Sequence, residues 1–350
     1  MSPAIKKSFP NIIVIRASLY LITVLLISCA TTDEFSAPKM QNFSTQEIEL
    51  GDKGKQLFET FFEFNHEEKL HNYMNGVGKN LLYPTPWENL PFSFQIIQSL
   101  DINAFAVPGG HVYVTSGMLS FLQTENQLAA VLAHELGHII SGHALKRYKR
   151  IDETIELARK LSDQIGTEVA KQVTATFSAA IIRGYRREQE LEADNFSSKM
   201  INRTNYPNDA VLKTLTSLNN MENAIRTISD TENDEKSTHS IFSSHPAFEQ
   251  RIELAAQNWK KYGNKKRVIT TDTPDNYLKK IDGMIIKNYS DVSLILSLVK
   301  LDQSNDISRL LKSEQTPELL MNYIMLLNQL TSWDQLSYPA TVKWVTAKPR

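Results

Sequence analysis

Apolar residues recur at intervals of three and four in the first part of the chain. Ser44 and Glu47 have the spacing of a capping box, and the segment that they open carries a broad apolar face up to about Phe64. We therefore predict a helix there. A second helix is predicted over residues 70–81, where two prolines follow and end it.

Between Phe92 and Val114, short runs of Phe, Ile and Val replace the helical spacing. The sequence Pro108-Gly109-Gly110 within this segment is typical of a tight turn. The pattern therefore predicts a small antiparallel sheet ahead of the remaining helices.

The next helices are predicted from the same apolar spacing. A helix over 125–149 is apolar on most sides and is expected to be buried, and an amphipathic helix over 151–182 is interpreted as a packing helix. Two more are predicted over 185–202 and 246–259. The polar, acidic stretch 230–244 between them predicts an exposed loop.

A change of composition at Gly263 is interpreted as a domain boundary, because a basic stretch is followed there by Thr, Asp and Pro. Beyond it, residues 274–350 show two or three helical patterns and a final strand over 341–346, with no convincing internal repeat. We therefore expect an α+β protein, mainly helical, with one domain over 44–262 and a C-terminal extension over 263–350 of unknown role.

Composition favours a globular protein. Hydrophobic residues make up 41% of the 350 residues and charged residues 22%, which are ordinary values for a globular chain. The net charge of −1 gives no electrostatic reason to expect a nucleic-acid partner. Cys29 is the single cysteine, so a metal site in this chain must use nitrogen and oxygen ligands.

The residues before Cys29 resemble a bacterial lipoprotein signal peptide. Basic residues precede an apolar run over 17–27, and a small residue stands directly before the cysteine. We expect residues 1–28 to be removed, Cys29 to be acylated, for example with palmitate, and residues 29–43 to tether the protein to the membrane. The alternative is an uncleaved N-terminal anchor, for which the apolar run is short. By resemblance to lipoprotein sorting in enteric bacteria, Ala30 favours the periplasmic face of the outer membrane.

The pattern HELGH at residues 134–138 lies inside a predicted helix. His134 and His138 are one turn apart on the same face and can bind one metal ion together. Zinc held in this way keeps a position for water, whose pKa falls to about 7, and Glu135 can take its proton as general base. The pattern predicts a zinc metalloendopeptidase with one Zn²⁺ per chain. The alternative is a pair of buried structural histidines.

The third ligand decides the class of site. A metzincin would place a histidine where this chain has Ala144, so His143 is either an ordinary helix residue or a group behind the ligands. The acidic stretch 188–194 offers a glutamate instead. Glu190 could reach the metal while Asp194, four positions later on the same face, fixes the second ring nitrogen of a histidine. The alternative interpretation of this stretch is a solvated charge run.

Several blocks together resemble peptidase family M48, the HtpX-like and CAAX-prenyl-protease-like zinc peptidases. They are NAFAVPGG from Asn103, VYV from Val112, the stretch 125–138 and ELEAD from Glu190, in the family's order and spacing. The resemblance covers about residues 44–258, is closest to the periplasmic lipoprotein or secreted branch, and implies a zincin-like domain with an HExxH active-site helix.

The resemblance also implies roles for individual residues. His134, His138 and Glu190 would be the metal ligands, and Glu135 would be the base. Asp194 would stand behind the ligands or donate a proton.

A later block, His245-Pro246 with Arg251, is also similar to the family. The resemblance implies that His245 can approach the metal and occupy the position of water or substrate in a resting state. Without the resemblance, His245 would be interpreted as a surface histidine after a polar loop.

Substrate-binding residues are suggested by the same resemblance. The strand that contains Val112, Tyr113 and Val114 would be the edge on which an extended substrate is laid by backbone pairing. Asn103 is a candidate hydrogen-bond donor to substrate, with holding of its own loop as the alternative. Arg251 is a further candidate.

These expectations lead to an endopeptidase that degrades misfolded or stalled envelope proteins, with polypeptides as substrates and envelope assembly machinery as a candidate partner. One alternative is a latent, zinc-bound scaffold or chaperone in which His245 keeps the metal site closed. Another is an unrelated membrane-tethered helical protein with a chance motif, which would bind no zinc.

Overall fold

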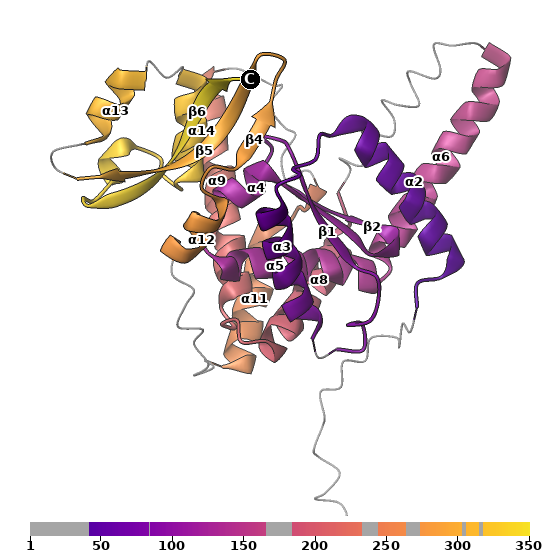
Figure 1. The fold of residues 1–350 in the computed structure, drawn as a ribbon. Coiled ribbons are helices and arrows are strands. Elements are labelled where there is room, and N and C mark those ends of the chain that lie inside the picture. Colours follow the sequence, from indigo (N-terminus) through magenta and orange to yellow (C-terminus); the bar gives the residue numbers. More distant parts are fainter. Residues whose placement is uncertain are drawn as a thin grey trace, which may run out of the picture. The chain divides into compact units, whose positions relative to one another are not determined.

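The computed structural model is mainly helical, with two small sheets (Figure 1). It describes residues 42–83, 85–165, 184–232, 244–263, 274–302, 306–314 and 318–350. Within these ranges, no helix has both the length and the apolar character needed to cross a bilayer. The α+β fold class expected from the sequence is confirmed. Cys29 and the expected leader lie outside the described residues.

Two helices open the described part of the chain, α2 (Thr45–Phe61) and α3 (Glu68–Leu82). The capping box is confirmed at the start of α2, where the Glu47 N–H donates to Ser44 Oγ at 3.2 Å and the Ser44 N–H donates to the Glu47 carboxylate at 2.9 Å. The periodicity therefore placed both helices correctly.

The first sheet contains β1 (Ser93–Ile97), β2 (Ala104–Val107) and β3 (His111–Thr115) in the order β1–β3–β2. β2 and β3 are antiparallel, as expected for a hairpin closed by the turn η2 (Pro108–Gly110). β1, however, pairs with β3 in parallel, so the sheet is mixed. The expectation of a wholly antiparallel sheet was wrong because β1 joins the far side of the hairpin instead of pairing with its sequence neighbour.

The central part of the chain begins with α4 (Ser116–Phe121), α5 (Glu125–Ile140) and α6 (His143–Ile165). The single helix predicted over 125–149 is broken, because Gly142 adopts a φ of 70° that ends the α-helical path. α6 covers the beginning of the helix predicted over 151–182, and the remainder of that prediction lies outside the described residues.

Three more helices complete the region around α5. They are α8 (Arg187–Arg203), α9 (Ala210–Glu232) and α11 (Phe248–Tyr262), and α8 and α9 both pack against α5. α8 and α11 match predicted helices, whereas α9 was not predicted. A Cβ on Gly137 would lie 3.1 Å from the Ala193 carbonyl oxygen, so this glycine allows α5 and α8 to approach closely.

The C-terminal residues form a second, antiparallel sheet in the order β4–β5–β6. The final predicted strand is present, but β4 and β5 were missed. β5 reads SLILSLV over much of its length, a pattern that does not distinguish a strand from a buried helix. The elements of this region are α12 (Pro274–Ile281), β4 (Ile285–Asn288), β5 (Val292–Leu301), α13 (Ile307–Glu314), α14 (Glu318–Leu327), η3 (Trp333–Gln335) and β6 (Ala340–Pro349).

Lys343 of β6 connects this second sheet to α4. Its side chain is 1% exposed, and Nζ donates to the carbonyl oxygens of Ser120, Phe121 and Leu122 at 2.6, 3.0 and 2.8 Å, and to that of Leu327 at 3.0 Å. Three of these acceptors are at the C-terminal end of α4, where helix carbonyls lack intrahelical partners. The lysine thus acts as a cap for the segment directly before α5.

Candidate metal centre

Two histidines of α5 point to a common centre. His134 and His138 lie one turn apart in a helix whose residues are almost all buried, and their Nε2 atoms are 3.0 Å apart. The arrangement expected from HELGH is therefore present, with both rings inside the protein.

A carboxylate from α8 completes a group of three. Glu190 is fully buried, and its Oε1 lies 3.3 Å from His138 Nε2 while its Oε2 lies 3.5 Å from His134 Nε2. The solvated-face alternative for this part of α8 does not apply to Glu190. The close approach of α8 at Gly137 is what brings the carboxylate to the histidines.

His245 is the fourth member of the group. Its Nδ1 lies 3.1 Å from Glu190 Oε1 and 3.2 Å from His134 Nε2. The candidate ligand atoms of His134, His138, Glu190 and His245 all lie within 4.8 Å of one another. Three imidazole nitrogens and one carboxylate oxygen form a donor set that suits zinc and related divalent metals.

Glu135 lies beside this group. It is 2% exposed, its Oε1 is 3.7 Å from His245 Nε2, and its Oε2 has no hydrogen-bond partner among the described residues. A buried carboxylate oxygen without a partner is costly, and a metal-associated water would satisfy it. The residues present therefore fit a metal site with a neighbouring proton acceptor.

Asp194 and Arg251 stand behind the ligands. Asp194 Oδ1 lies 2.9 Å from His134 Nδ1, the ring nitrogen that faces away from the group. Arg251 donates from Nε to Asp194 Oδ2 at 2.7 Å, and its Nη1 lies 2.8 Å from Glu190 Oε2. Arg251 is buried, so it balances two carboxylates instead of facing an open substrate surface.

These contacts set the protonation of the buried groups. Burial acts to raise the pKa of Glu190 and of Asp194, but the Arg251 guanidinium outweighs it and holds both pKa values below their usual range. Burial and Arg251 act to lower the pKa of His134, yet Asp194 and Glu190 raise it to about 9. Burial keeps the pKa of His138 well below its ordinary value, which favours the neutral ring that binds metals.

The sequence did not identify the aromatic group on His138. The Tyr185 ring stacks on the His138 ring with centroids 3.6 Å apart and an interplanar angle of 11°, and the Arg147 guanidinium lies 4.8 Å from the centroid of the Tyr185 ring. An aromatic residue shortly before Glu190 was the only available signal. The stack fixes the plane of the imidazole.

The predicted substrate strand is not an edge. β3 lies between β1 and β2, and Val112, Tyr113 and Val114 are all fully buried, so the expectation that they form an open edge was wrong. The family resemblance suggested that this strand binds substrate, but it could not predict the order of the strands in the sheet. Asn103 is also buried, and its Oδ1 accepts from Ser244 Oγ at 3.1 Å, so it contacts the residue next to His245.

Comparison with known proteins decides the family. The sequence model of peptidase family M48 matches residues 65–259, which contain all four members of the candidate metal group. The chain belongs to peptidase family M48. It is therefore a metalloprotease, and its mainly helical fold with an HExxH helix is that of an M48 domain.

Named M48 relatives cover different shares of the chain. The metalloprotease YcaL of Escherichia coli (strain K12) is 24% identical over 229 residues, which are 64% of this chain and 80% of YcaL. The beta-barrel assembly-enhancing protease of the same organism is 25% identical over 176 residues, 47% of this chain and 36% of that protein. The mitochondrial metalloendopeptidase OMA1 of Schizosaccharomyces pombe (strain 972) is 35% identical over 75 residues, 21% of this chain and 22% of OMA1.

The cavity at the M48 metal group is small. Its volume is about 30 Å³, and its walls include His134, Glu135 and the α9 side chains Val211, Leu215 and Leu218. Such a space holds about one water molecule. The cavity lined by the described residues is therefore too small for a peptide substrate.

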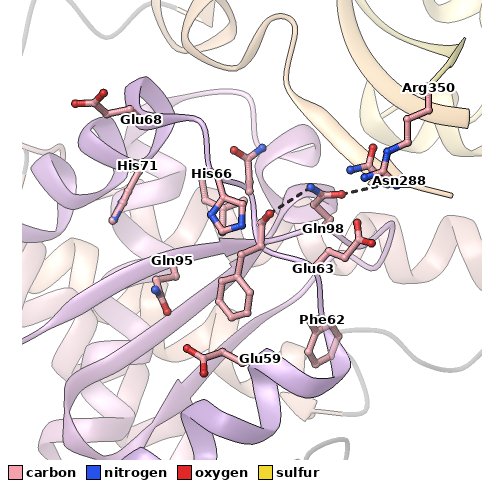
Figure 2. Close-up of a pocket in the computed structure, with 13 residues that line it drawn as sticks. Glu59, Phe62, Glu63, His66, Glu68, His71, Gln95, Gln98, Asn288 and Arg350 are labelled. Carbon is pink, nitrogen blue, oxygen red and sulfur yellow. Dashed lines mark hydrogen bonds between the residues drawn. The ribbon is translucent and has the colours of Figure 1, made fainter. Parts of the chain in front are cut away.

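A much larger hollow of about 730 Å³ lies elsewhere, along the outer side of β1 (Figure 2). Gln98 lies in its wall, where it donates to the Phe64 carbonyl at 3.3 Å and accepts from the Asn288 N–H at 3.1 Å. None of the four members of the metal group lines this hollow. The small cavity is therefore the candidate catalytic centre, because His134, Glu135 and His245 line it.

Proposed function

We propose that this M48 metalloprotease is a zinc endopeptidase that binds one Zn²⁺ through His134, His138 and Glu190. The observation that carries the proposal is the convergence of these side chains and His245 on one point, with donor atoms within 4.8 Å of one another. Nitrogen and carboxylate ligands of this kind are those of catalytic zinc sites in peptidases.

Zinc in this site would polarise the scissile carbonyl and lower the pKa of the attacking water. Glu135 accepts the proton of that water and delivers it to the leaving amine. Asp194 holds the ring of His134 through its Nδ1 contact of 2.9 Å. Arg251 keeps Glu190 and Asp194 ionised, so that both act as anions in a buried place.

The outer edge of β2 is the better candidate for substrate pairing. β2 pairs only with β3 among the described strands and packs against α5. Since the Thr115 N–H donates to the Asn103 carbonyl, the alternation of antiparallel pairing directs the backbone groups of Ala104 and Ala106 away from β3. An extended substrate could pair there by strand addition. Both alanines are buried in this conformation, which agrees with a closed site.

In our proposal the structure is a latent, inactive form of the enzyme, because His245 fills the fourth position at the metal. Catalytic zinc sites keep three protein ligands and one open position, whereas four protein ligands are typical of closed sites. The contacts of His245 with Glu190 and His134 favour a resting state in which this histidine occupies the fourth position. The same observation supports a second candidate function, a zinc-bound scaffold or chaperone that binds clients without cleaving them.

The proposed substrates are misfolded or stalled proteins of the bacterial envelope, and envelope assembly machinery is a proposed partner. The support is the set of M48 relatives named beta-barrel assembly-enhancing protease. The lipoprotein-like leader supports a lipid on Cys29 and a place at the periplasmic face of the outer membrane.

The test is a comparison of the full-length protein with two variants, in zinc content per chain and in cleavage of casein. Glu135→Gln should keep zinc and lose cleavage, and His245→Ala should keep zinc and cleave faster than the parent. The exposed residue His71, in the wall of the large hollow, provides the control variant His71→Ala.

The alternatives give different results. A parent protein without zinc would refute the zinc assignment. Zinc without cleavage in both the parent and His245→Ala, combined with a cellular function that survives Glu135→Gln, would support the scaffold instead.

A further inference from the structure

The break between α5 and α6 brings His143 back to the metal site. In a continuous helix, residue 143 would be rotated by about 140° from residue 138 and would point away from it. Gly142, with a φ of 70°, turns the chain so that His143 Nδ1 lies 3.1 Å from His138 Nδ1. A Cβ on Gly142 would meet nothing within 4 Å, so the glycine is required for its backbone conformation and not for space.

His143 continues the contact to the protein surface. The residue is 2% exposed, and its Nε2 lies 3.2 Å from Glu192 Oε2. The Glu192 side chain is 61% exposed, in contrast to the fully buried Glu190 two positions before it. A chain of hydrogen bonds thus runs from His138 through His143 to a solvated carboxylate.

The hydrogen-bond partners determine which ring nitrogen donates at each step from His138 to Glu192. His138 faces the metal group with Nε2, so its Nδ1 carries the hydrogen and donates to His143 Nδ1. His143 then carries its hydrogen on Nε2 and donates to the Glu192 carboxylate, which can only accept. Both hydrogen bonds are therefore satisfied by neutral imidazoles, each in a single tautomer.

We propose that His143 is a positioning residue for the metal ligand His138, acting as the hydrogen-bond acceptor that fixes its tautomer and ring rotation. The inference rests on the proposed zinc-peptidase function. With this role for His143, each of the two histidine ligands has a hydrogen-bond acceptor at its Nδ1. Asp194 accepts from His134, and His143 accepts from His138. The Tyr185 stack holds the plane of the His138 ring, and His143 determines its rotation within that plane.

The test measures the zinc dissociation constant of the full-length protein by competition with a chromogenic chelator. His143→Leu removes the acceptor at similar volume and should weaken zinc binding about tenfold to hundredfold. In His143→Asn the side-chain oxygen stands close to the position of the original Nδ1, so zinc affinity should largely recover although the contact with Glu192 is lost. The exposed His66, in the wall of the large hollow, supplies the control His66→Leu, which should bind zinc like the parent.

Melting temperatures of the chelator-treated proteins distinguish an effect of His143 on the orientation of His138 from an effect on folding. The proposal requires that His143→Leu and His143→Asn melt alike without zinc but differ in zinc affinity. Equal affinity of His143→Leu and parent, or equal loss in both His143 variants, would overturn it. A parent protein that binds no zinc would refute the proposed function itself, and this result is distinct from a failure of His143 alone.

Discussion

Arg251 is the residue on which the charge balance of the site depends. It is buried with two carboxylates, and its contacts with Glu190 and Asp194 are between 2.7 and 3.0 Å. Exposed ion pairs such as Lys53 with Asp152, by comparison, are screened by water and contribute little to stability. Removing one partner of a buried pair, by contrast, leaves an uncompensated charge.

Arg251→Met should therefore lower the free energy of unfolding by about 3 to 5 kcal/mol. Urea denaturation followed by circular dichroism measures the change. The control is Lys53→Met, which removes one member of an exposed ion pair and should cost less than about 1 kcal/mol. Similar values for both variants would show that burial does not strengthen the dependence on Arg251.

The stability of chelator-treated protein should depend on pH on both sides of its maximum. Glu190 and Asp194 have folded pKa values below their unfolded values of about 4, so their stabilisation is complete above that pH and is lost below it. His134, with a folded pKa of about 9 against an unfolded value of about 6.5, stabilises fully below about pH 6.5 and loses this contribution towards pH 9. Melting temperatures should peak between about pH 5 and 6.5, and a steady rise to pH 9 would contradict the assignment.

At the scale of residues, the sequence predicted the metal-site residues of α5 and α8 because each pair is close together along the chain. The separation of four between His134 and His138, and between Glu190 and Asp194, places each pair on one helix face. The proximity of His245 followed only from the family resemblance, since a loop residue carries no periodic signal.

At the scale of elements, the site depends on how closely α5 and α8 approach. Gly137 faces the backbone of Ala193, and this contact holds Glu190 at the histidines. The helices themselves could be predicted from apolar spacing. Their contact, the break at Gly142 and the parallel pairing of β1 could not, because each depends on residues distant in sequence or on one backbone angle.

Gly137→Val should push α8 away from α5, because a Cβ alone would lie 3.1 Å from the Ala193 oxygen and valine adds two methyl groups. We expect the free energy of unfolding, measured by urea denaturation, to fall by about 1 to 3 kcal/mol. Zinc binding, measured by chelator competition, should also become weaker. The matched control is Gly76→Ala in α3, where a Cβ would meet nothing within 4 Å. That variant should be neutral or slightly more stable, since alanine favours helix.

At the scale of the whole molecule, the C-terminal sheet supports the segment that leads into α5. Besides Lys343, Tyr277 donates from its hydroxyl to the Leu119 carbonyl at 2.7 Å. The sequence indicated a C-terminal extension but not this support, because a lysine in a strand is normally expected at the surface. The limits of the domains stay a prediction.

Lys343→Met should destabilise the protein by about 1 to 3 kcal/mol or more, since it leaves several buried carbonyl oxygens without a donor. Thermal and urea unfolding measure the effect. Lys348 lies in the same strand but is exposed, so Lys348→Met is the control and should change stability by less than about 0.5 kcal/mol. Equal effects of the two substitutions would show that the four carbonyl contacts do not matter.

The cavity of about 30 Å³ beside His134 has a kinetic consequence. A chelator such as phenanthroline is far larger than water and can reach the proposed zinc only while the site is transiently open. Zinc release should therefore follow first-order kinetics, with a rate that levels off as the chelator concentration rises. The plateau equals the opening rate of the enzyme, and His245→Ala should raise it if this histidine holds the site closed.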